Sequence, residues 1–266
     1  MGGNGNRPGR PLAFTTLACP AWSLERAVEA AQTYGYGGLE LRLLDGEIIE
    51  ADLAPEARRR VRSALEAAGL PAVALDTSIR LAAASPADVR PLLDLAAEWR
   101  CPLIRVFGGD GSRDAMARLL DAVAPEAERA GVGIAVETHD ALSSARDVAE
   151  LLALVESPAV GALWDVLHTH RMGETPEVAL AHLGGRLRHV HVKDGRPRPG
   201  GDGSDWELVL LGEGTVPLAD SLDAMTRAGY RGWLSVEWEK KWHPEIPEPE
   251  VALPQHAAAL ERLAAG

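Results

Sequence analysis

The chain has 266 residues, a length that single α/β barrels commonly reach, and its 46% hydrophobic and 25% charged residues are an ordinary globular composition. No apolar run approaches the roughly 18 residues that a membrane span needs, so we expect no membrane partner. The net charge of −12 argues against a nucleic-acid partner, because phosphate binding depends on clustered Lys and Arg.

The first ten residues, MGGNGNRPGR, are rich in Gly and Asn. We expect residues 1–10 to form a loose tail before a single domain over residues 11–266. The two cysteines, Cys19 and Cys101, lie far apart without CxxC spacing, which disfavours a disulfide scaffold or a zinc–thiolate site. This cysteine usage fits a reducing cytoplasm.

Short apolar runs alternate with longer amphipathic ones from end to end. The apolar runs predict strands at 12–16, 38–42, 72–76, 103–107, 133–138, 160–165, 187–192 and 233–237. The amphipathic runs, with Pro near their starts and Gly at their ends, predict helices at 23–35, 55–69, 85–99, 114–131, 143–155, 174–184, 217–229 and 249–263. Strands that are each followed by a helix, with no linker between two halves, indicate a single (β/α)8 TIM barrel.

A doubly wound open sheet is the alternative architecture. Such a sheet normally carries a glycine-rich phosphate loop after an early strand, and the first turn here, TTLACPAWS, has none. The longest irregular stretch, residues 194–214, is too rich in Gly and Pro to be core, and in a barrel it would lie over the mouth after the seventh strand.

Four adjacent predicted strands each end in a side chain that can bind a metal. These residues are Glu137, Asp165, His191 and Glu237, and in a barrel the carboxyl ends of the strands form the active site. Three carboxylates and one imidazole are a mostly hard donor set that favours Mn²⁺, with Mg²⁺, Co²⁺ and Zn²⁺ as alternatives. Alone, each residue has an ordinary explanation, such as a helix cap or an ion pair. Their coincidence at one level predicts a site for one divalent cation.

Further polar residues are expected inside the barrel. Alternation in HVHVKDG places His189 and Lys193 on the same face as His191. We expect His189 to support the site rather than to bind metal, and Lys193 either to contact substrate or to pair with a carboxylate. Glu40 and Arg105 should point inward, where a mutual or networked ion pair is favoured over substrate contact.

The segment after the last strand, EWEKKWHPEIPEP, has prolines that forbid an immediate helix and indicate an ordered lid. Lys240 and Trp242 in this segment could receive an anionic or phosphorylated sugar, and a solvated loop is the alternative. Arg196 and His139 are weaker candidates for substrate contact.

Six motifs, GLELR, VETHD, WDVLH, HVHVKDGR, LGEG and GYRGWLSVEWE, resemble in order and spacing the xylose-isomerase-like TIM barrel superfamily. The similarity spans residues 12–263 and points to the sugar phosphate isomerase/epimerase group, which includes ketose 3-epimerases, inosose dehydratases and 3-dehydroshikimate dehydratases. The resemblance implies that the four residues above hold one divalent cation. It also implies that Glu137 and Glu237 are an acid/base pair, and that His168, the histidine of D-x-x-H, touches substrate hydroxyls.

The chemistry of such a site is coherent. A cation chelated by adjacent carbonyl and hydroxyl oxygens acidifies the neighbouring C–H bond and stabilises an enediolate. We therefore expect a metal-dependent isomerase or epimerase of a sugar or polyol-derived ketone, phosphorylated or not, in which Glu137 and Glu237 move the proton. A dehydratase of an inosose or related cyclic ketone is the alternative, because it needs nearly the same ligands. HVKDGR departs from the ketose epimerases and leaves the substrate open.

Two rivals belong to other classes. An apurinic-endonuclease-like hydrolase would need more His and Asp ligands, for a three-zinc cluster, and a basic face for DNA. A non-catalytic sugar-binding barrel is disfavoured because the whole ligand set is intact. Trp206 fits either a subunit interface or a substrate lid, so a homo-oligomer stays open.

Overall fold

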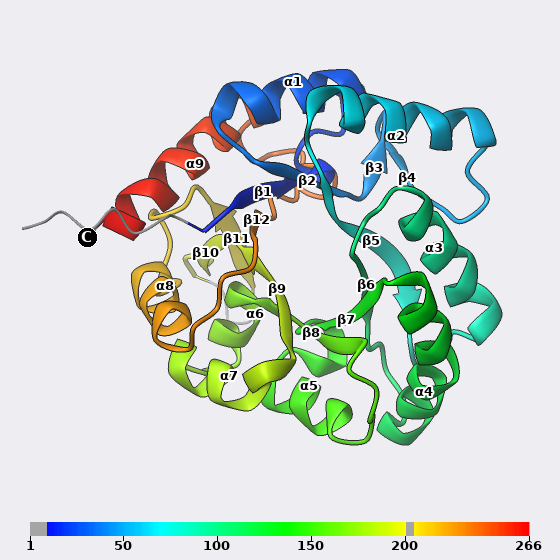
Figure 1. Cartoon of the computed structure of the whole chain (residues 1–266). Helices are drawn as coiled ribbons and strands as arrows, with labels where there is room; N and C mark the ends of the chain where they lie inside the picture. The colour runs from blue at the N-terminus through cyan, green and yellow to red at the C-terminus, as the bar shows by residue number, and fades with distance from the viewer. Residues whose placement is uncertain (1–9, 201–204, 266) are drawn as a thin grey trace, which may run out of the picture.

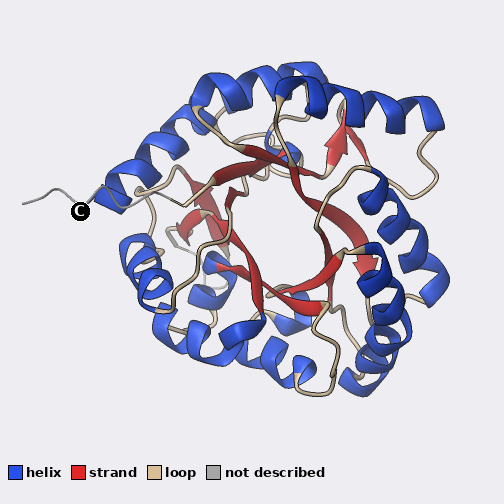
Figure 2. Ribbon diagram, viewed as in Figure 1, coloured by secondary structure: helices blue, strands red, loops and turns tan. Residues whose placement is uncertain are grey.

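The computed structural model describes residues 10–200 and 205–265. Parallel strands close into a barrel in the order β1-β12-β9-β8-β7-β6-β5-β2 (Figure 2). The barrel strands are β1 (Leu12–Thr15), β2 (Gly38–Leu41), β5 (Ala72–Arg80), β6 (Leu103–Phe107), β7 (Gly133–Glu137), β8 (Val160–Asp165), β9 (Leu187–Val192) and β12 (Leu234–Val236). The TIM barrel is confirmed, and the open doubly wound sheet is excluded because both edges of the sheet are paired.

Helices surround the barrel on all sides (Figure 1). The main ones are α1 (Leu24–Tyr34), α2 (Pro55–Ala68), α3 (Pro86–Glu98), α4 (Arg113–Ala130), α5 (Ala145–Leu152), α7 (Pro176–Leu183), α8 (Leu218–Arg227) and α9 (Pro249–Ala265). Several begin with Pro in the first turn, where its missing N–H costs nothing. Helices α1, α2 and α4 end at Gly35, Gly69 and Gly131, whose left-handed φ angles of 82°, 65° and 67° suit glycine. The helices therefore begin and end near the Pro and Gly residues from which the sequence analysis predicted them.

Short elements that the sequence analysis did not predict lie at the carboxyl ends of the strands. Helix α6 (Val166–Arg171) follows β8 directly. Two antiparallel hairpins, β3 (Leu43–Leu44) with β4 (Glu47–Ile48), and β10 (Asp194–Pro197) with β11 (Trp206–Val209), follow β2 and β9. Single-turn 3-10 helices follow β1 and β7 at Thr16–Ala18 and Asp140–Leu142, whereas a third, Gly184–Arg186, lies at the amino end of β9.

The expectation for residues 194–214 was therefore wrong in part. The stretch contains an ordered hairpin, and Asp194 and Leu211 are buried, with 1% and 3% exposure. Its Gly and Pro content misled the interpretation because a two-stranded ribbon needs few side-chain contacts. It can be held by backbone hydrogen bonds, which composition does not reveal.

The barrel interior is layered. Four buried apolar residues, Ala74, Leu103, Ala135 and Leu163, form a small cluster separate from the main core. Each comes from a different strand, and side chains in a strand alternate between faces, so the residue two positions later points into the barrel as well. Those later residues are Asp76, Arg105, Glu137 and Asp165. An apolar layer thus supports a polar layer at the carboxyl ends of the strands.

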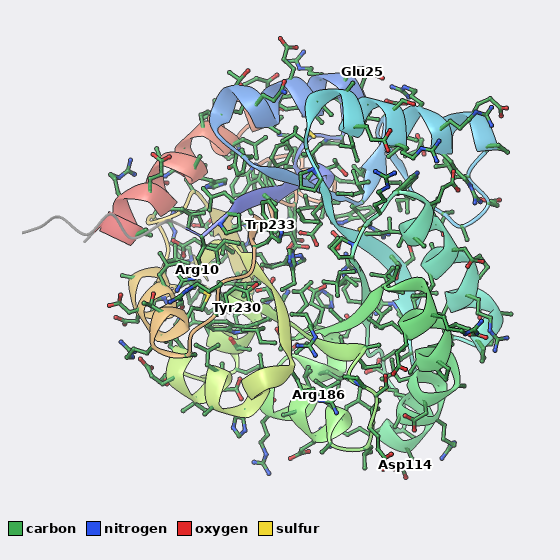
Figure 3. The ribbon with its side chains drawn as sticks, viewed as in Figure 1. Arg10, Glu25, Asp114, Arg186, Tyr230 and Trp233 are labelled. Atoms are coloured by element: carbon green, nitrogen blue, oxygen red, sulfur yellow. The ribbon has the colours of Figure 1, made fainter. Side chains whose placement is uncertain are left out.

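The expected loose tail, residues 1–10, lies outside the described residues except for Arg10. The guanidinium of Arg10 donates hydrogen bonds to Thr226 Oγ1 at 2.7 Å and to the carbonyls of Leu222 and Tyr230 at 3.3 Å. Figure 3 labels Arg10 and Tyr230 beside α8. Arg10 is therefore tied to the barrel, which corrects its assignment to the tail. Across the described residues, no helix has both the length and the apolar run that crossing a membrane requires.

Candidate metal centre

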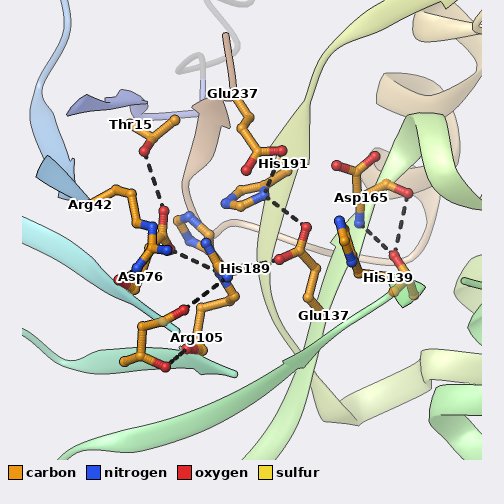
Figure 4. Close-up of polar contacts among 12 residues, drawn as sticks. Thr15, Arg42, Asp76, Arg105, Glu137, His139, Asp165, His189, His191 and Glu237 are labelled. Carbon is orange, nitrogen blue, oxygen red and sulfur yellow. Dashed lines mark hydrogen bonds and ion pairs between the residues drawn. The ribbon is translucent and has the colours of Figure 1, made fainter. Parts of the chain in front are cut away.

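The four residues predicted to bind a cation come together at the carboxyl end of the barrel (Figure 4). One donor atom from each of Glu137, Asp165, His191 and Glu237 lies within 4.8 Å of the others, and all four residues are buried. Nδ1 of His191 is 3.5 Å from Oε1 of Glu137 and 3.4 Å from Oε2 of Glu237. Glu137, Asp165 and His191 lie on β7, β8 and β9, and Glu237 follows β12 directly.

Several of these donor atoms have no hydrogen-bond partner among the described residues. They are both carboxylate oxygens of Glu137, Oδ2 of Asp165 and Nδ1 of His191. Two of these oxygens lie beside cations, Oε2 of Glu137 at 3.2 Å from Nε of Arg105 and Oδ2 of Asp165 at 2.9 Å from Nζ of Lys193, but no hydrogen bond completes any of the four atoms. Buried polar atoms almost always have a hydrogen-bond partner, so this cluster needs an explanation. A divalent cation bound by three carboxylates and one imidazole would satisfy them, and the residues therefore fit such an ion.

A carboxylate on the far side of the barrel fixes the ring of His191. Oε1 of Glu40, on β2, is 2.9 Å from Nε2 of His191, and Oε2 of Glu40 is 3.1 Å from Nε2 of His189. Burial alone would raise the pKa of Glu40, but the two imidazoles outweigh it and hold that pKa well below its usual range. With Nε2 engaged, Nδ1 of His191 faces the carboxylates, the arrangement common to metal-bound histidines. The supporting role expected of His189 stays a prediction, because Glu40, His189 and His191 form a second group whose donor atoms lie within 4.8 Å of one another.

Arg105 lies between two other carboxylates. Its Nε is 3.2 Å from Oε2 of Glu137 and 3.4 Å from Oδ1 of Asp76. The networked form of the expected ion pair is therefore present, but Glu40 pairs with histidines instead of Arg105, because Asp76 on the intervening strand β5 takes the guanidinium. Burial would raise the pKa of Glu137, but Arg105 outweighs it and the pKa is about 2. Glu137 is ionised at neutral pH.

Asp165 uses its two oxygens differently. Oδ1 caps the unpredicted helix α6 by accepting the backbone N–H groups of Leu167 at 2.8 Å and His168 at 3.0 Å. Oδ2 faces the site, 3.8 Å from Nε2 of His168. Burial raises the pKa of Asp165 to about 6, against the attraction of Lys193. The D-x-x-H spacing follows from this geometry, since the cap places the third helical residue beside the carboxylate.

Lys193 bridges three carboxylates. Its Nζ lies 2.5 Å from Oε2 of Glu237, 2.6 Å from Oε1 of Glu239 and 2.9 Å from Oδ2 of Asp165, and its side chain is 2% exposed. Burial would lower the pKa of Lys193, but Asp165, Glu237 and Glu239 hold it well above its usual range. Lys193 was expected either to contact substrate or to pair with a carboxylate, and these contacts are of the second kind.

A cavity of about 460 Å³ lies beside His168, whose Nε2 is 3.8 Å from Oδ2 of Asp165; the four residues themselves are not part of its lining. Its lining residues come from the loop after β7, from α6 and from the β10–β11 hairpin: His139, Asp140, Ser143, His168, Arg171, Met172 and Trp206. The ring of His139 contacts those of Phe107 and His168, with centroids 4.6 and 4.7 Å apart. His168 and His139 both line this cavity, and their contact with a substrate stays a prediction.

The structure does not bring Arg196 and Lys240 to this cavity. Arg196 pairs with Glu207 across the hairpin at 2.6 Å and is about half exposed. The ammonium of Lys240 donates to the carbonyls of Pro244 and Ile246, each at 2.6 Å, and so ties the expected lid segment together. These interactions give no support to the substrate binding that was expected of Arg196 and Lys240.

Sequence reasoning missed Asp76 and Glu239. Asp76 ends a predicted strand, as the metal-binding candidates do, and Thr15 donates to its Oδ2 at 3.2 Å. Burial and the nearby charge of Glu40 raise the pKa of Asp76 well above its usual range. Glu239 is two residues beyond Glu237, a spacing that could have indicated a second carboxylate on the same side.

Known proteins resemble this chain in sequence and in fold. A family model described as xylose isomerase-like TIM barrel matches residues 28–263. The chain belongs to this family. Fructoselysine 3-epimerase of Escherichia coli O157:H7 is 28% identical over 127 residues, which are 46% of this chain and 44% of that protein. An inosose dehydratase of Lacticaseibacillus casei is 23% identical over 144 residues, 49% of this chain and 48% of that protein.

The chain thus spans about half the length of these relatives of the xylose isomerase-like family. Among solved structures, the IOLI protein with a bound zinc atom superposes with a TM-score of 0.78 at 18% identity, over 96% of this chain and 98% of that one. This likeness shows that the two chains share a fold.

Proposed function

We propose that the protein is a divalent-cation-dependent isomerase or epimerase that moves the proton beside the carbonyl of a sugar or polyol-derived ketone. One observation carries the proposal: Glu137 and Glu237 approach Nδ1 of His191 from different strands, at 3.5 and 3.4 Å. Two carboxylates around one centre give a base and an acid for the two faces of a bound ketone. When bound, the cation would polarise the carbonyl oxygen, and Mn²⁺ suits the donor set.

The chain's own charges prepare both carboxylates for this role. Arg105 stabilises the ionised form of Glu137, and Lys193 stabilises that of Glu237, whose pKa is held well below its usual range despite burial. Each is therefore ionised at neutral pH, so either can be the base, and the other must take up a proton from solvent before it can act as the acid. His168, 3.8 Å from Asp165 and lining the adjoining cavity, is the candidate to bind a substrate hydroxyl.

We further propose that the substrate is uncharged. Lys193 is committed to three carboxylates, Arg105 to Glu137 and Asp76, and Arg80 at the rim pairs with Asp140. A phosphate or carboxylate bound by Lys193 or Arg105 would have to break one of these pairs and would leave buried charge unpaired, which is costly. A neutral polyol ketone needs only hydrogen bonds. A phosphorylated substrate is the alternative.

A dehydratase is the second candidate, and a specific observation favours it. The inosose dehydratases among the relatives match about as much of the chain as the fructoselysine 3-epimerases do. One of the two carboxylates would then remove the proton from carbon and, now protonated, could pass it to the leaving hydroxyl, which departs as water. His168 adds a further hydrogen-bonding group near that position.

The deciding experiment is proton NMR in D₂O with the Mn²⁺- or Mg²⁺-loaded protein, using Mg²⁺ for the spectra. The probes are D-allulose, D-fructose, 2-keto-myo-inositol and the corresponding sugar phosphates. We expect deuterium to enter beside the carbonyl of an uncharged probe. Glu137→Gln and Glu237→Gln should each slow this exchange by about 10²–10⁴-fold, because each removes one acid/base group.

The products separate the candidates. A new stereoisomer without water loss supports an epimerase, a shifted carbonyl supports an isomerase, and a conjugated or dicarbonyl product supports the dehydratase. Tight Mn²⁺ binding without exchange in any probe would contradict the proposal and favour a sugar-binding barrel. Exchange in the phosphates alone would contradict the uncharged substrate and leave the chemistry intact.

Two further expectations remain proposals. Cys19 and Cys101 are both free and buried, which fits a cytoplasmic protein. Trp206 belongs to the cavity lining, which favours its role at the substrate over one in a homo-oligomer interface.

A further inference from the structure

The carboxylate of Asp194 is bound by four backbone N–H groups. Oδ1 accepts from Gly195 at 2.8 Å and from Val216 at 3.2 Å, and Oδ2 accepts from Gly212 at 2.9 Å and from Gly214 at 3.0 Å. Asp194 is 1% exposed. Hydrogen bonds to an ionised acceptor are the strong ones, and both oxygens are used. The carboxylate therefore joins the end of β9 to a segment about 20 residues later in the chain.

The approach of the two segments requires glycine at one point. A Cβ at Gly214 would lie 2.1 Å from Oδ1 of Asp194 and 2.5 Å from the carbonyl oxygen of Gly195. Thr215 N–H also donates to that carbonyl at 2.9 Å. The Asp of HVKDGR and the last Gly of LGEG are thus two halves of one contact.

This contact closes the base of the β10–β11 hairpin. Along the hairpin, Pro197 pairs with Trp206, and the indole of Trp206 forms part of the cavity wall that includes His168. The ring of His170 meets this indole edge-on at 5.7 Å between centroids, and the guanidinium of Arg171 lies over it at 5.8 Å. Trp206, on β11, therefore packs the hairpin that Asp194 closes against helix α6.

We propose that Asp194 is a positioning residue for substrate binding: it holds the hairpin so that Trp206 forms one wall of the ketone's cavity. Asp194 does not act on the reacting atoms, because each of its two carboxylate oxygens already accepts hydrogen bonds from two backbone N–H groups. The inference rests on the proposed function, since the cavity is assigned to the substrate there. It predicts an effect on substrate affinity that is separable from the chemistry.

The first test is the steady-state kinetics of Asp194→Asn with the best uncharged probe of the NMR panel. The amide of Asn cannot accept the two N–H groups that Oδ2 binds, so the hairpin loosens. We expect KM to rise by about tenfold or more, the equivalent of one charge-assisted hydrogen bond, while kcat changes by less than about threefold. Asp205→Asn, which removes a carboxylate from the exposed surface of the same hairpin, is the matched control and should leave both constants unchanged.

A double-mutant cycle tests whether Asp194 acts through Trp206. Trp206→Ala should raise KM to a similar extent, and Asp194→Asn should add little in the Trp206→Ala background. Gly214→Ala disrupts the same contact from the other side and should reproduce the KM effect, which keeps the proposal testable if Asp194→Asn folds poorly.

Hydrogen–deuterium exchange of the Mn²⁺-loaded protein gives a readout independent of turnover. In Asp194→Asn, amides of residues 195–200 and 205–216 should lose protection, while those of β9 should not. Three outcomes would each overturn the inference: unchanged protection of these amides, a fall in kcat with KM unchanged, or KM effects of the two substitutions that multiply in the double-mutant cycle. In each case, turnover by the wild type would leave the proposed function standing. Absence of turnover in the wild type would overturn the proposed function and the inference with it.

Discussion

The two sides of His191 differ in how completely their polar atoms are satisfied. On the side of β2 and β5, Glu40 binds both histidines, Asp76 is bonded by Thr15 and Arg105, and neither carboxyl leaves an unpartnered buried atom among the described residues. On the side of β7 and β8, buried oxygens of Glu137 and Asp165 form ion pairs with Arg105 and Lys193 but have no hydrogen-bond partner in the described part of the chain.

We infer from this difference that the side of β2 and β5 supports His191, whereas the side of β7 and β8 binds the cation. A satisfied network is rigid and fixes the orientation of the His191 ring, whereas a cluster of unsatisfied atoms is costly to keep unless a ligand completes it. The open side is also where the cavity and His168 lie. Four substitutions test whether this contrast is real.

The largest effect is expected for Lys193→Met on the open side. Removing one partner of a buried charge cluster leaves Asp165, Glu237 and Glu239 to repel one another, so the metal-free protein should lose about 3–5 kcal/mol of unfolding free energy. Mn²⁺ should restore more stability to this variant than to the wild type, because the cation replaces the missing positive charge.

Urea unfolding with and without Mn²⁺ measures this effect. Lys241→Met is the control, since that ammonium donates to the carbonyl of Gly46 and lies outside the carboxylate cluster. An equal stability loss with and without Mn²⁺ would mean that Lys193 and the cation do not share the same carboxylates.

Glu40→Gln tests the supporting side. The amide cannot accept hydrogen bonds from both imidazoles, so the ring of His191 should lose its fixed orientation. We expect Mn²⁺ affinity to fall by about 10–100-fold, as for other residues that orient a metal-bound histidine. Isothermal titration calorimetry measures it, with Glu50→Gln, at an exposed contact with Ser78, as the control. Unchanged affinity would remove Nδ1 of His191 from the set of ligands.

His256 sharpens the comparison, because it has an orphan atom away from the metal centre. Its Nε2 has no partner among the described residues, its ring packs on Trp238, and burial lowers its pKa to about 3. Between about pH 6.5 and pH 3 the unfolded chain binds a proton that the folded chain excludes. The folded state therefore has its full stability with respect to His256 above about pH 6.5, and it loses stability relative to the unfolded state as the pH falls from about 6.5 to about 3.

From pH 7 to pH 5, the wild type should therefore lose about 2 kcal/mol of unfolding free energy relative to His256→Gln. Urea unfolding at both pH values measures the difference. The exchange rate and Mn²⁺ affinity at pH 7 should stay unchanged. A loss of Mn²⁺ affinity would show that orphan atoms outside the four-residue cluster also serve the site.

The smallest effect is expected for Arg196→Gln. Its ion pair with Glu207 is solvent-exposed, and such pairs contribute about 0–1 kcal/mol. We expect KM for the best probe to stay within about twofold of the wild-type value. A rise of tenfold or more would place Arg196 at the substrate and extend the open side along the hairpin.

The sequence by itself determined the barrel and the set of candidate ligands. Apolar alternation identified the strands, and parallel strands place their carboxyl ends on one face of a barrel, so Glu137, Asp165, His191 and Glu237 had to converge. Local chemistry also determined most helix limits, because Pro at the start and Gly at the end act on neighbouring residues alone. Helix α6 was missed because it has only six residues and its cap, Asp165, read as the end of a strand.

Tertiary structure decided which charges meet. Glu40 on β2 and His191 on β9 are not on neighbouring strands, and their contact spans the barrel, so it depends on how the strands tilt and stagger on closure. The contact of Asp194 with Gly212 and Gly214 likewise depends on the path of the loop between them. Periodicity reports which face a side chain occupies, but the partner across the barrel is set by the closed geometry of the whole chain.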